Sequence, residues 1–461
     1  MHSARIARLY TLAVLTLTLT LAASSAYATS YYVAKTGSNS NAGTLAAPFL
    51  TIQHGVNQLN PGDNLYVRTG TYAEAVTIWD KAGTSSLPIY ISPYNGEEVV
   101  IDGTGKTGSN GVVVIGDSSY VRFDGFEVKN GPNGGIFIYD ANNVKVRWND
   151  VHHMGSGGIN AKTASASSFG TAHHLVIEGN AVHHNMQDNS DRDENSVWLQ
   201  GISAVRCDYV DIIGNYVYEN YGEGIDYIGS DHGLIRDNSI WDNFSVNLYL
   251  DNAQYTTVDR NWIITGWAPS YTNYYRGGNA AGGIGVANEY YTEQNPATDL
   301  TITNNIVVRC NTGFAYRNSE YGGGLHNTLI ANNTFADSQY LSLSIQNGTN
   351  DANIHTTTTI KNNIFYAKSG TSYASAPTTG FTYQTNCWYN GTANTHKSGT
   401  GDVLQDPLLV SALGSDAEDY MLTSTSPCKN TGTATSAVTQ DYFGTTRSGR
   451  GTGIDIGAHE Y

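Results

Sequence analysis

The chain has 461 residues and is acidic, with 24 Lys and Arg against 40 Asp and Glu and a formal net charge of −16. A nucleic-acid partner needs clustered Lys and Arg, so this composition argues against one. Beyond the N-terminus no apolar run approaches the ~18 residues of a membrane span. We expect no membrane span and a monomer, and the 50 Gly and 32 Tyr favour a turn-rich β protein.

The first residues have the pattern of an export signal. Arg5 and Arg8 precede an apolar run over residues 9–23, and Ala26-Tyr27-Ala28 follows as a small-residue cleavage site. This order of basic, apolar and small residues is typical of a secretory signal peptide. We therefore expect residues 1–28 to be removed and the mature protein to be secreted, in the periplasm or outside the cell.

A repeat of about 23 residues runs through the middle of the chain. Asn215, Asn238 and Asn261 follow one another at equal spacings within similar segments such as "IIGNYVYENYGEGIDYIGSDHG" and "IRDNSIWDNFSVNLYLDNAQY", and Asn305 recurs in a later one. A fixed period of this size indicates a solenoid. We expect the four Asn side chains to form a ladder of hydrogen bonds along its axis.

Each repeat holds two short alternating runs separated by Gly or Asn, which is the pattern of half-buried strands. Strands this short bury an apolar face only when each stacks on the equivalent strand of the next repeat, ~4.8 Å away. The sequence thus predicts an all-β parallel β-helix. We expect an N-terminal cap with the first strands over 29–90, coils over 91–370, and a C-terminal coil and capping region over 371–461.

The opening segment, the "GTY" after "PGDNLYVR", the coil pattern and the closing "DIGAHEY" resemble the secreted right-handed parallel β-helix proteins of the pectate lyase superfamily. The resemblance covers nearly the whole mature chain and implies a right-handed helix. That superfamily includes polysaccharide lyases, inverting glycoside hydrolases and non-enzymatic surface proteins. The fold alone therefore leaves the reaction open.

The segment "HHNMQDNSDRDENSVWLQGISAVRCDYVDIIGNYVYENYGEGIDYI" is similar to the family 9 pectate lyases, which place an acidic loop after a His-His-Asn turn and two Gly-hydrophobic strands after the loop. Those lyases carry a catalytic Lys on a neighbouring strand. Here the strand "GISAVRC" offers only Arg206, and "GIDYIGSD" offers no such base. The catalytic Lys of that family is therefore not matched.

In such helices a substrate groove follows the outward side chains of the Gly-Ile strand. Aligning the repeats on Ile202, Ile225 and Leu248 as inward residues places a polar set on one outer face. This set consists of Lys162, Arg206, Asp226, Tyr249, Asp251, Glu289 and Arg317. Insertions near 186–200 and 266–282 interrupt the coils beside it, and insertions on one face of a solenoid often form a binding wall.

One hypothesis from these residues is a polysaccharide lyase that acts on a uronate-containing glycan. A lyase needs a base for the proton next to the uronate carboxylate and a cation that neutralises the carboxylate. Arg206 or Lys162 would be the base or the carboxylate binder. The alternative is that Lys162 is an exposed strand residue, and Arg206 is explained as well by a structural role. Calcium would bind hard oxygen ligands in the acidic loop, namely Asp188, Asp191, Asp193 and Glu194. That loop lacks EF-hand spacing, so a solvated acidic loop is the alternative.

The competing hypothesis is an inverting glycoside hydrolase, which needs two carboxyl groups ~6.5–9.5 Å apart. Asp226 and Asp251 lie one coil apart and two residues out of step, which places their backbones about 8 Å apart. Glu223, Asp231 and His232 lie nearby and could supply another acid. A non-catalytic carbohydrate-binding or adhesin-like protein is the third interpretation.

Aromatic and basic side chains near this face are candidates for binding the glycan. We expect Tyr249, Arg317, Glu289 and Trp198 to contact substrate, with help from Trp267 and from tyrosines of the 266–282 insertion, although simple turn packing explains these tyrosines as well.

Paired histidines at 152–153, 173–174 and 183–184 suggest a metal site at first sight. His152 and His183, however, occupy the position of Tyr218 and Trp241 on another sheet, so we predict a structural ring stack. Of the four Cys, Cys387 and Cys428 could form a disulfide, and no C-x-x-C spacing indicates a metal or redox site.

Overall fold

The computed structural model describes nine stretches of the chain. They are residues 28–107, 110–164, 169–192, 199–266, 278–289, 296–317, 323–347, 354–447 and 453–461. Residues 1–27 of the proposed signal peptide, Trp198, Asp193, Glu194 and residues 267–277 lie outside them. Within the described residues, no helix is both long and apolar enough to cross a membrane.

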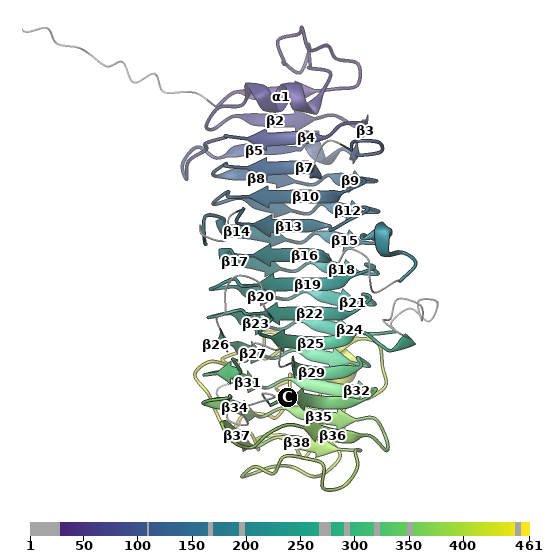
Figure 1. The fold of residues 1–461 in the computed structure, drawn as a ribbon, viewed down its shortest axis with the longest axis vertical. Coiled ribbons are helices and arrows are strands. Elements are labelled where there is room, and N and C mark those ends of the chain that lie inside the picture. The colour runs from purple at the N-terminus through teal and green to yellow at the C-terminus, as the bar shows by residue number, and fades with distance from the viewer. Residues whose placement is uncertain are drawn as a thin grey trace, which may run out of the picture.

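The chain winds into a right-handed parallel β-helix of stacked coils (Figure 1). Each coil contributes a strand to each of three parallel sheets. Sheet 1 contains β1 (Ser30–Val33), β2 (Asn64–Val67), β5 (Ile89–Pro93), β8 (Val121–Asp124), β11 (Lys145–Arg147), β14 (His173–Glu178), β17 (Asp208–Ile213), β20 (Leu234–Arg236), β23 (Thr257–Asp259), β27 (Thr301–Thr303), β31 (Leu329–Ala331), β34 (Thr358–Lys361) and β37 (Phe381–Gln384).

Sheet 2 contains β4 (Val76–Trp79), β7 (Gly111–Gly116), β10 (Gly134–Tyr139), β13 (Ile159–Lys162), β16 (Gln200–Val205), β19 (Glu223–Ile228), β22 (Val246–Asp251), β25 (Gly282–Ala287), β29 (Thr312–Arg317), β33 (Leu341–Ile345) and β36 (Ser372–Ser375). Sheet 3 contains β3 (Gly70–Tyr72), β6 (Val99–Asp102), β9 (Glu127–Lys129), β12 (Asp150–His152), β15 (Ala181–His183), β18 (Tyr216–Tyr218), β21 (Ser239–Trp241), β24 (Trp262–Ile264), β28 (Ile306–Val308), β32 (Thr334–Ser338), β35 (Ile364–Ala367) and β38 (Cys387–Tyr389). A small separate pair is β26 (Ala297–Thr298) with β30 (Leu325–His326).

The helix α1 (Ile52–Gln58) covers the first coil. Its N-cap Thr51 accepts a hydrogen bond from the His54 backbone, and the carboxylate of Glu74 accepts from the backbone N–H groups of Ile52 and Gln53. These contacts satisfy amides that have no partner inside a helix. Single 3₁₀ turns lie at Tyr94–Gly96, Gln187–Asn189 and Ala417–Tyr420.

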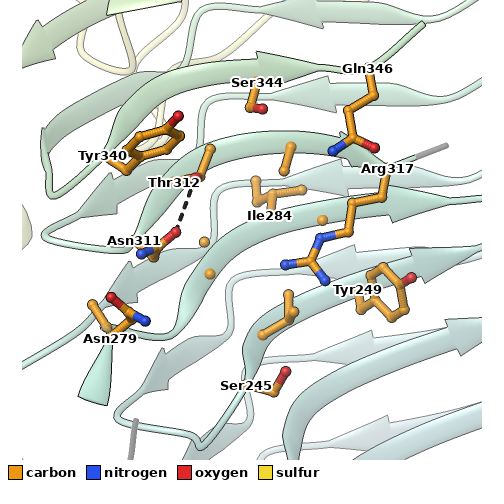
Figure 2. A pocket seen from close by; sticks show the side chains of 16 residues that line it. Ser245, Tyr249, Asn279, Ile284, Asn311, Thr312, Arg317, Tyr340, Ser344 and Gln346 are labelled. Carbon is orange, nitrogen blue, oxygen red and sulfur yellow. Dashed lines mark hydrogen bonds between the residues drawn. The ribbon is translucent and has the colours of Figure 1, made fainter. Parts of the chain in front are cut away.

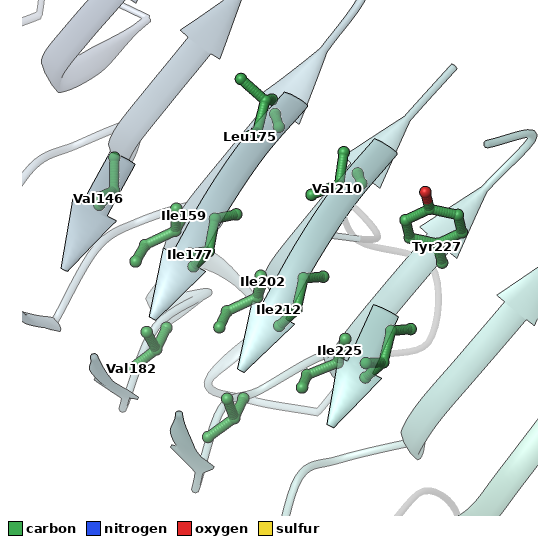
Figure 3. Close-up of a cluster of buried hydrophobic side chains, with 14 of the residues drawn as sticks. Val146, Ile159, Leu175, Ile177, Val182, Ile202, Val210, Ile212, Ile225 and Tyr227 are labelled. Carbon is green, nitrogen blue, oxygen red and sulfur yellow. The ribbon is translucent and has the colours of Figure 1, made fainter. Parts of the chain in front are cut away.

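The core is a set of aliphatic stacks that run along the helix axis (Figure 3). In sheet 2, Ile159, Ile202 and Ile225 are register partners on successive strands, and all three are fully buried. Full burial of such a side chain is worth roughly 1.5–3 kcal/mol. Because side chains alternate across a strand, this inward set fixes which residues point outward on every coil.

The predicted asparagine ladder is confirmed. The Asn238 side chain accepts from the backbone N–H and the side-chain amide of Asn215, and it donates to Asn261 at 2.9 Å. The same bonds continue through Asn305. All are buried, so the ladder satisfies turn amides that no strand pairs. Nine coils share it, from Asn149 and Asn180 to Asn333, Asn363 and Asn386.

The histidine prediction is also confirmed. His152, His183, Tyr218 and Trp241 stack in sheet 3, with centroid separations of 5.0, 4.7 and 4.3 Å and nearly parallel planes. This stack lies on a different sheet from the polar set of sheet 2.

The C-terminal tail does more than close the last coil. Thr400 and Val403 bridge to the last strands of sheets 1 and 3, and the chain then runs back over the outer side of sheet 3. There, Leu422 and Ile456 join a buried cluster with Ile306. The C-terminus accordingly lies beside the later coils rather than beyond them (Figure 1).

All four cysteines are buried free thiols in the structure. Cys387 and Cys428 lie within hydrogen-bonding reach, and this contact together with burial raises the pKa of Cys387 well above its usual range. The structure thus brings together the two cysteines suggested as a disulfide, in their reduced form.

Candidate functional site on the outer face of sheet 2

The strand register gathers the polar set in two rows on the outer face of sheet 2. In the first row, Ser203, Asp226 and Tyr249 are partners on β16, β19 and β22. In the second, Asp251 pairs with Ile228 on β19, and two strands further on the same position is Arg317. Two residues separate the rows, so both point outward and form one continuous band.

Asp226 is a buried carboxyl group in the middle of the band, with 2% of its surface exposed. Burial, and then the nearby carboxyl groups of Glu223, Asp251 and Glu289, raises its pKa well above the usual range. Its Oδ1 is buried without a hydrogen-bond partner. A buried, unpaired oxygen of this kind is costly in a purely structural residue, so Asp226 has the character of a functional acid.

Asp251 lies beside it on the next strand and is 1% exposed. Burial is the main reason that its pKa rises to about 7, and the carboxylates of Glu289 and Glu223 add to the effect. The backbone N–H of Glu289 donates to Asp251 at 2.9 Å and opposes that rise. A carboxyl group with a pKa near 7 can give or take a proton at neutral pH.

Tyr249 connects these acids to the open groove. Its hydroxyl donates to Glu289 at 2.5 Å, and its ring lies over Gly285 on the next strand. A Cβ on Gly285 would approach the ring to 2.9 Å, so the glycine makes room for the tyrosine. Burial and the neighbouring carboxylates of Glu289 and Asp251 raise the pKa of Tyr249, which keeps it protonated.

Basic side chains lie at both ends of the acid cluster. Lys162 ends β13, in the row of Asp251 and three strands before it. Arg206 follows β16 in a left-handed turn (φ +55°) at the edge of the sheet. Arg317 ends β29, two strands beyond Asp251, and is exposed. The band is therefore positive at its ends and acidic in the middle.

A pocket of about 440 Å³ opens beside Tyr249 on the outer face of β22, β25 and β29. In Figure 2, Arg317 and Tyr249 lie on one side of it, and Tyr340 and Asn311 on the other. A depression of about 280 Å³ shares Tyr340 with this pocket, and another of about 610 Å³ shares Gln346 with it. Together they form a groove that leads from Tyr249 toward the last coils, and the volume of the first pocket is in the range of ligand sites.

Some groove residues were not predicted from the sequence. Gln346 follows Ile345, which pairs with Tyr316, so it occupies the row of Arg317 one coil further on. Extending the alignment by one repeat would have found it. Tyr340 lies outside the strand pattern, in the turn before β33, and no periodic signal marks it.

The acidic loop is only partly described. Asp188 and Asp191 are exposed near the 3₁₀ turn Gln187–Asn189, whereas Asp193 and Glu194 lie outside the described residues. Over the stretches that the structure describes, no three His, Cys, Asp or Glu side chains are arranged to hold a metal ion.

Comparison with known proteins places this architecture in a family. The family model described as "Pel9A-like, right handed beta helix region" matches residues 31–363. The chain belongs to this Pel9A-like family. The match spans most of the coils and includes every strand of the polar band.

Relatives of the Pel9A-like chain include pectate lyases. Pectate lyase PEL9 of Emericella nidulans is 37% identical over 125 residues, which cover 24% of this chain and 30% of that protein. Pectate lyase L of Dickeya dadantii is 23% identical over 319 residues, 64% of this chain and 69% of that protein. The chain thus spans less than a third of the first relative and about two thirds of the second.

Solved structures share the fold at low identity. The crystal structure of pectate lyase Pel9A has a TM-score of 0.53 at 18% identity, covering 94% of this chain and 96% of that one. The complex of XylC with xylose has a TM-score of 0.57 at 14% identity, covering 82% and 87%. Likenesses at this identity establish the β-helix and leave the reaction open.

Proposed function

We propose that the protein is a secreted polysaccharide lyase that cleaves an acidic, uronate-containing glycan by β-elimination. The observation that carries the proposal is the band on sheet 2, in which the buried acids Asp226 and Asp251 lie between basic side chains, next to a pocket that Tyr249 and Arg317 line. A polyuronate chain lying along the helix axis would place its carboxylates at Lys162 or Arg206 on one side and at Arg317 on the other. The pectate lyases among its relatives support the same substrate class.

In this mechanism the base is Lys162 or Arg206. It removes the proton from the carbon that bears the uronate carboxylate, a double bond forms to the neighbouring carbon, and the glycosidic C–O bond breaks. The departing oxygen takes a proton from Asp251, whose pKa of about 7 leaves it partly protonated at neutral pH. Lys162 and Asp251 lie three strand spacings apart, ~14 Å between backbones, a gap that two side chains and a sugar ring can span.

Tyr249 and Glu289 position this proton donor and line the path of the substrate. Tyr249 holds Glu289 by its short hydrogen bond, and the backbone of Glu289 holds Asp251. The three groups thus form a connected chain from the pocket to the acid. Trp198, outside the described residues, remains a proposed substrate contact.

Calcium assistance is part of the proposal and is assigned to the acidic loop of Asp188, Asp191, Asp193 and Glu194. Carboxylate oxygens are the ligands that calcium prefers, and a bound cation would neutralise a substrate carboxylate. Because the described residues do not form a metal cage, no step of the mechanism is derived through the ion. Calorimetric titration with calcium tests the assignment: we expect Asp188→Asn/Asp191→Asn to weaken binding at least tenfold, and unchanged binding would refute it.

A second candidate is inverting hydrolysis, which the raised pKa values of Asp226 and Asp251 favour. Asp226, held protonated, would give its proton to the leaving oxygen, and Asp251 would activate a water molecule. The pair lies on adjacent strands, and the mechanism needs the two carboxyl groups to be ~6.5–9.5 Å apart. This alternative uses the same two acids without any base at Lys162 or Arg206.

The products separate the two functions. A lyase forms an unsaturated uronate that absorbs in the ultraviolet, whereas a hydrolase forms reducing ends without that chromophore. Purified protein should be incubated with pectate, alginate and glycosaminoglycans, with calcium and with chelator. Ultraviolet absorbance that rises in step with reducing ends supports elimination, and reducing ends alone support hydrolysis. If neither product forms with any glycan, the result supports a non-catalytic carbohydrate-binding protein.

A further inference from the structure

A second pocket lies away from the groove, on the outer face of sheet 1. It has a volume of about 390 Å³ and spans β8, β11, β14 and β17 near the turns that begin these strands. Its lining combines aromatic rings with two cations, chiefly Tyr120, Arg122, Asn143, Lys145, His174 and Tyr209. None of these residues belongs to the polar band of sheet 2.

The pocket lies where an aromatic ladder is interrupted. Tyr120, Asn143, His174 and Tyr209 occupy the same turn position on successive coils, each with φ between +51° and +53°. His174 and Tyr209 stack at 4.8 Å, and the stack continues to His232 at 4.6 Å. Asn143 breaks this series between Tyr120 and His174, which are two coil spacings apart, ~9.6 Å. That spacing leaves room for one ring between two aromatic faces.

The break is held open by local hydrogen bonding. The Asn143 side chain donates to Asn142 Oδ1 at 2.9 Å, so its amide is tied to the neighbouring residue. Tyr209 is 46% exposed, which leaves part of its ring accessible at the rim. A small, tethered side chain with rings on both sides is a suitable floor for a planar or chair-shaped ligand.

Two cations face the same space. Arg122 and Lys145 are direct register partners on β8 and β11, and within the described part of the chain neither forms a salt bridge. Arg122 lies 4.7 Å above the ring of Tyr90, and Asp211 is the acid among the lining residues. Like charges directly opposite on neighbouring strands are destabilising. The chain has a net charge of −16, so this pair forms a local positive patch on an acidic protein. A bound anion would stabilise it.

We propose that this pocket is a second, non-catalytic binding site for one carboxylated sugar unit of an acidic glycan. The sugar ring would lie over Asn143 between Tyr120 and His174, and its carboxylate would reach Arg122 and Lys145. An Arg guanidinium matches a carboxylate with two parallel hydrogen bonds, and the ammonium of Lys adds charge. Such a site would keep the protein on a polymeric substrate while the groove on sheet 2 acts on another part of the chain.

The test is binding of tetragalacturonate, measured by calorimetry in an Asp251→Asn background that slows turnover. We expect Arg122→Gln/Lys145→Gln to remove one of two binding events, or to weaken it at least tenfold, with an unchanged melting temperature. The matched control Lys106→Gln/Lys368→Gln removes the same charge elsewhere and should bind as the parent does. Arg317→Gln reports on the groove separately, so failure of one site does not imply failure of the other.

A neutral ligand tests the chemistry of the site. Maltotetraose should not occupy it, because the proposal depends on a carboxylate. Unchanged tetragalacturonate binding in Arg122→Gln/Lys145→Gln would overturn the proposal, as would an equal loss in the Lys106→Gln/Lys368→Gln control. Asn143→Tyr gives an independent check: filling the break in the ladder should abolish binding at this site and leave the groove event intact.

Discussion

Tyr249 and Glu289 form the hydrogen bond that joins the open groove to the buried acids. The Tyr249 hydroxyl donates to Glu289 at 2.5 Å, and the Glu289 backbone N–H donates to Asp251. Tyr249→Phe removes the first bond and leaves the ring in place. Because a hydrogen bond to a charged group is worth about 1.5–3 kcal/mol, we expect kcat to fall roughly ten- to a hundredfold, with little change in KM.

Tyr340 provides the control for this prediction. It lines the same pocket, but its side chain is 65% exposed. Tyr340→Phe should therefore keep kcat within about twofold of the parent. Equal effects of the two substitutions would contradict a positioning role for Tyr249.

Asp251 is expected to be essential for catalysis in both proposed mechanisms, whereas Asp226 takes part only in the hydrolase alternative. Removal of a general acid or base costs typically 10²–10⁴-fold in rate. Asp251→Asn should lose at least a hundredfold in kcat, measured by product formation under saturating substrate. Asp226→Asn should show a loss of this size only if the reaction is inverting hydrolysis. Asp231→Asn is a suitable comparison, because the backbone of Asp231 bridges to Asp208 and Gln254 near the starts of the sheet 1 strands, outside the strands of sheet 2. Near-normal turnover in Asp251→Asn would contradict both mechanisms, and near-normal turnover in Asp226→Asn would contradict hydrolysis by this pair.

The same acids should lower stability at neutral pH. The pKa of Asp251 is raised to about 7 in the folded protein, so the unfolded chain binds fewer protons between pH 4 and 7. This contribution to stability is full near pH 4 and is lost as the pH rises toward 7. Asp251→Asn carries no such charge, so its melting temperature should exceed that of the parent at pH 7.5 by a few degrees.

At pH 4, where the parent Asp251 is protonated, the two melting temperatures should converge. The measurement is differential scanning calorimetry with chelator present at both pH values. A constant difference at the two pH values would show that burial does not raise the pKa of Asp251 as described.

The sequence alone was sufficient to predict the repeat and its side-chain register. Alternation fixed Ile202, Ile225 and Leu248 as inward residues, and this placed Asp226 and Asp251 outward on neighbouring strands. Burial of the outward row was not predictable in this way. Asp226 and Tyr249 are only 2% and 6% exposed although they point away from the core. The sequence repeat predicts the coils and their register. Burial of outward side chains depends instead on contacts that do not repeat from coil to coil.

The same limit explains other findings that the sequence did not reveal. The hydrogen bond between Tyr249 and Glu289 joins a residue of β22 to a residue that follows the end of β25. Glu289 therefore lies outside the strand pattern that the repeat predicts. The pocket at Asn143 arises from a break in a ladder, which is a departure from the period. Periodic patterns predict architecture, and local departures from them create sites.

The asparagine ladder gives a stability prediction. Asn238→Ala removes an acceptor for the Asn215 backbone and side chain and leaves these donors buried without it. Each unsatisfied buried group costs about 1–3 kcal/mol. We expect the free energy of unfolding to fall by about 2–4 kcal/mol in urea titration. The exposed Asn57→Ala should change it by less than about 0.5 kcal/mol, and a similarly small effect of Asn238→Ala would show that the ladder is not stabilising.

The most direct test of the proposed function is the ultraviolet absorbance of products during digestion of pectate and other acidic glycans by the purified protein. We predict that absorbance of an unsaturated uronate rises in proportion to new reducing ends, and that Asp251→Asn abolishes both. Reducing ends without the chromophore, still dependent on Asp226 and Asp251, would contradict elimination and establish hydrolysis by this pair.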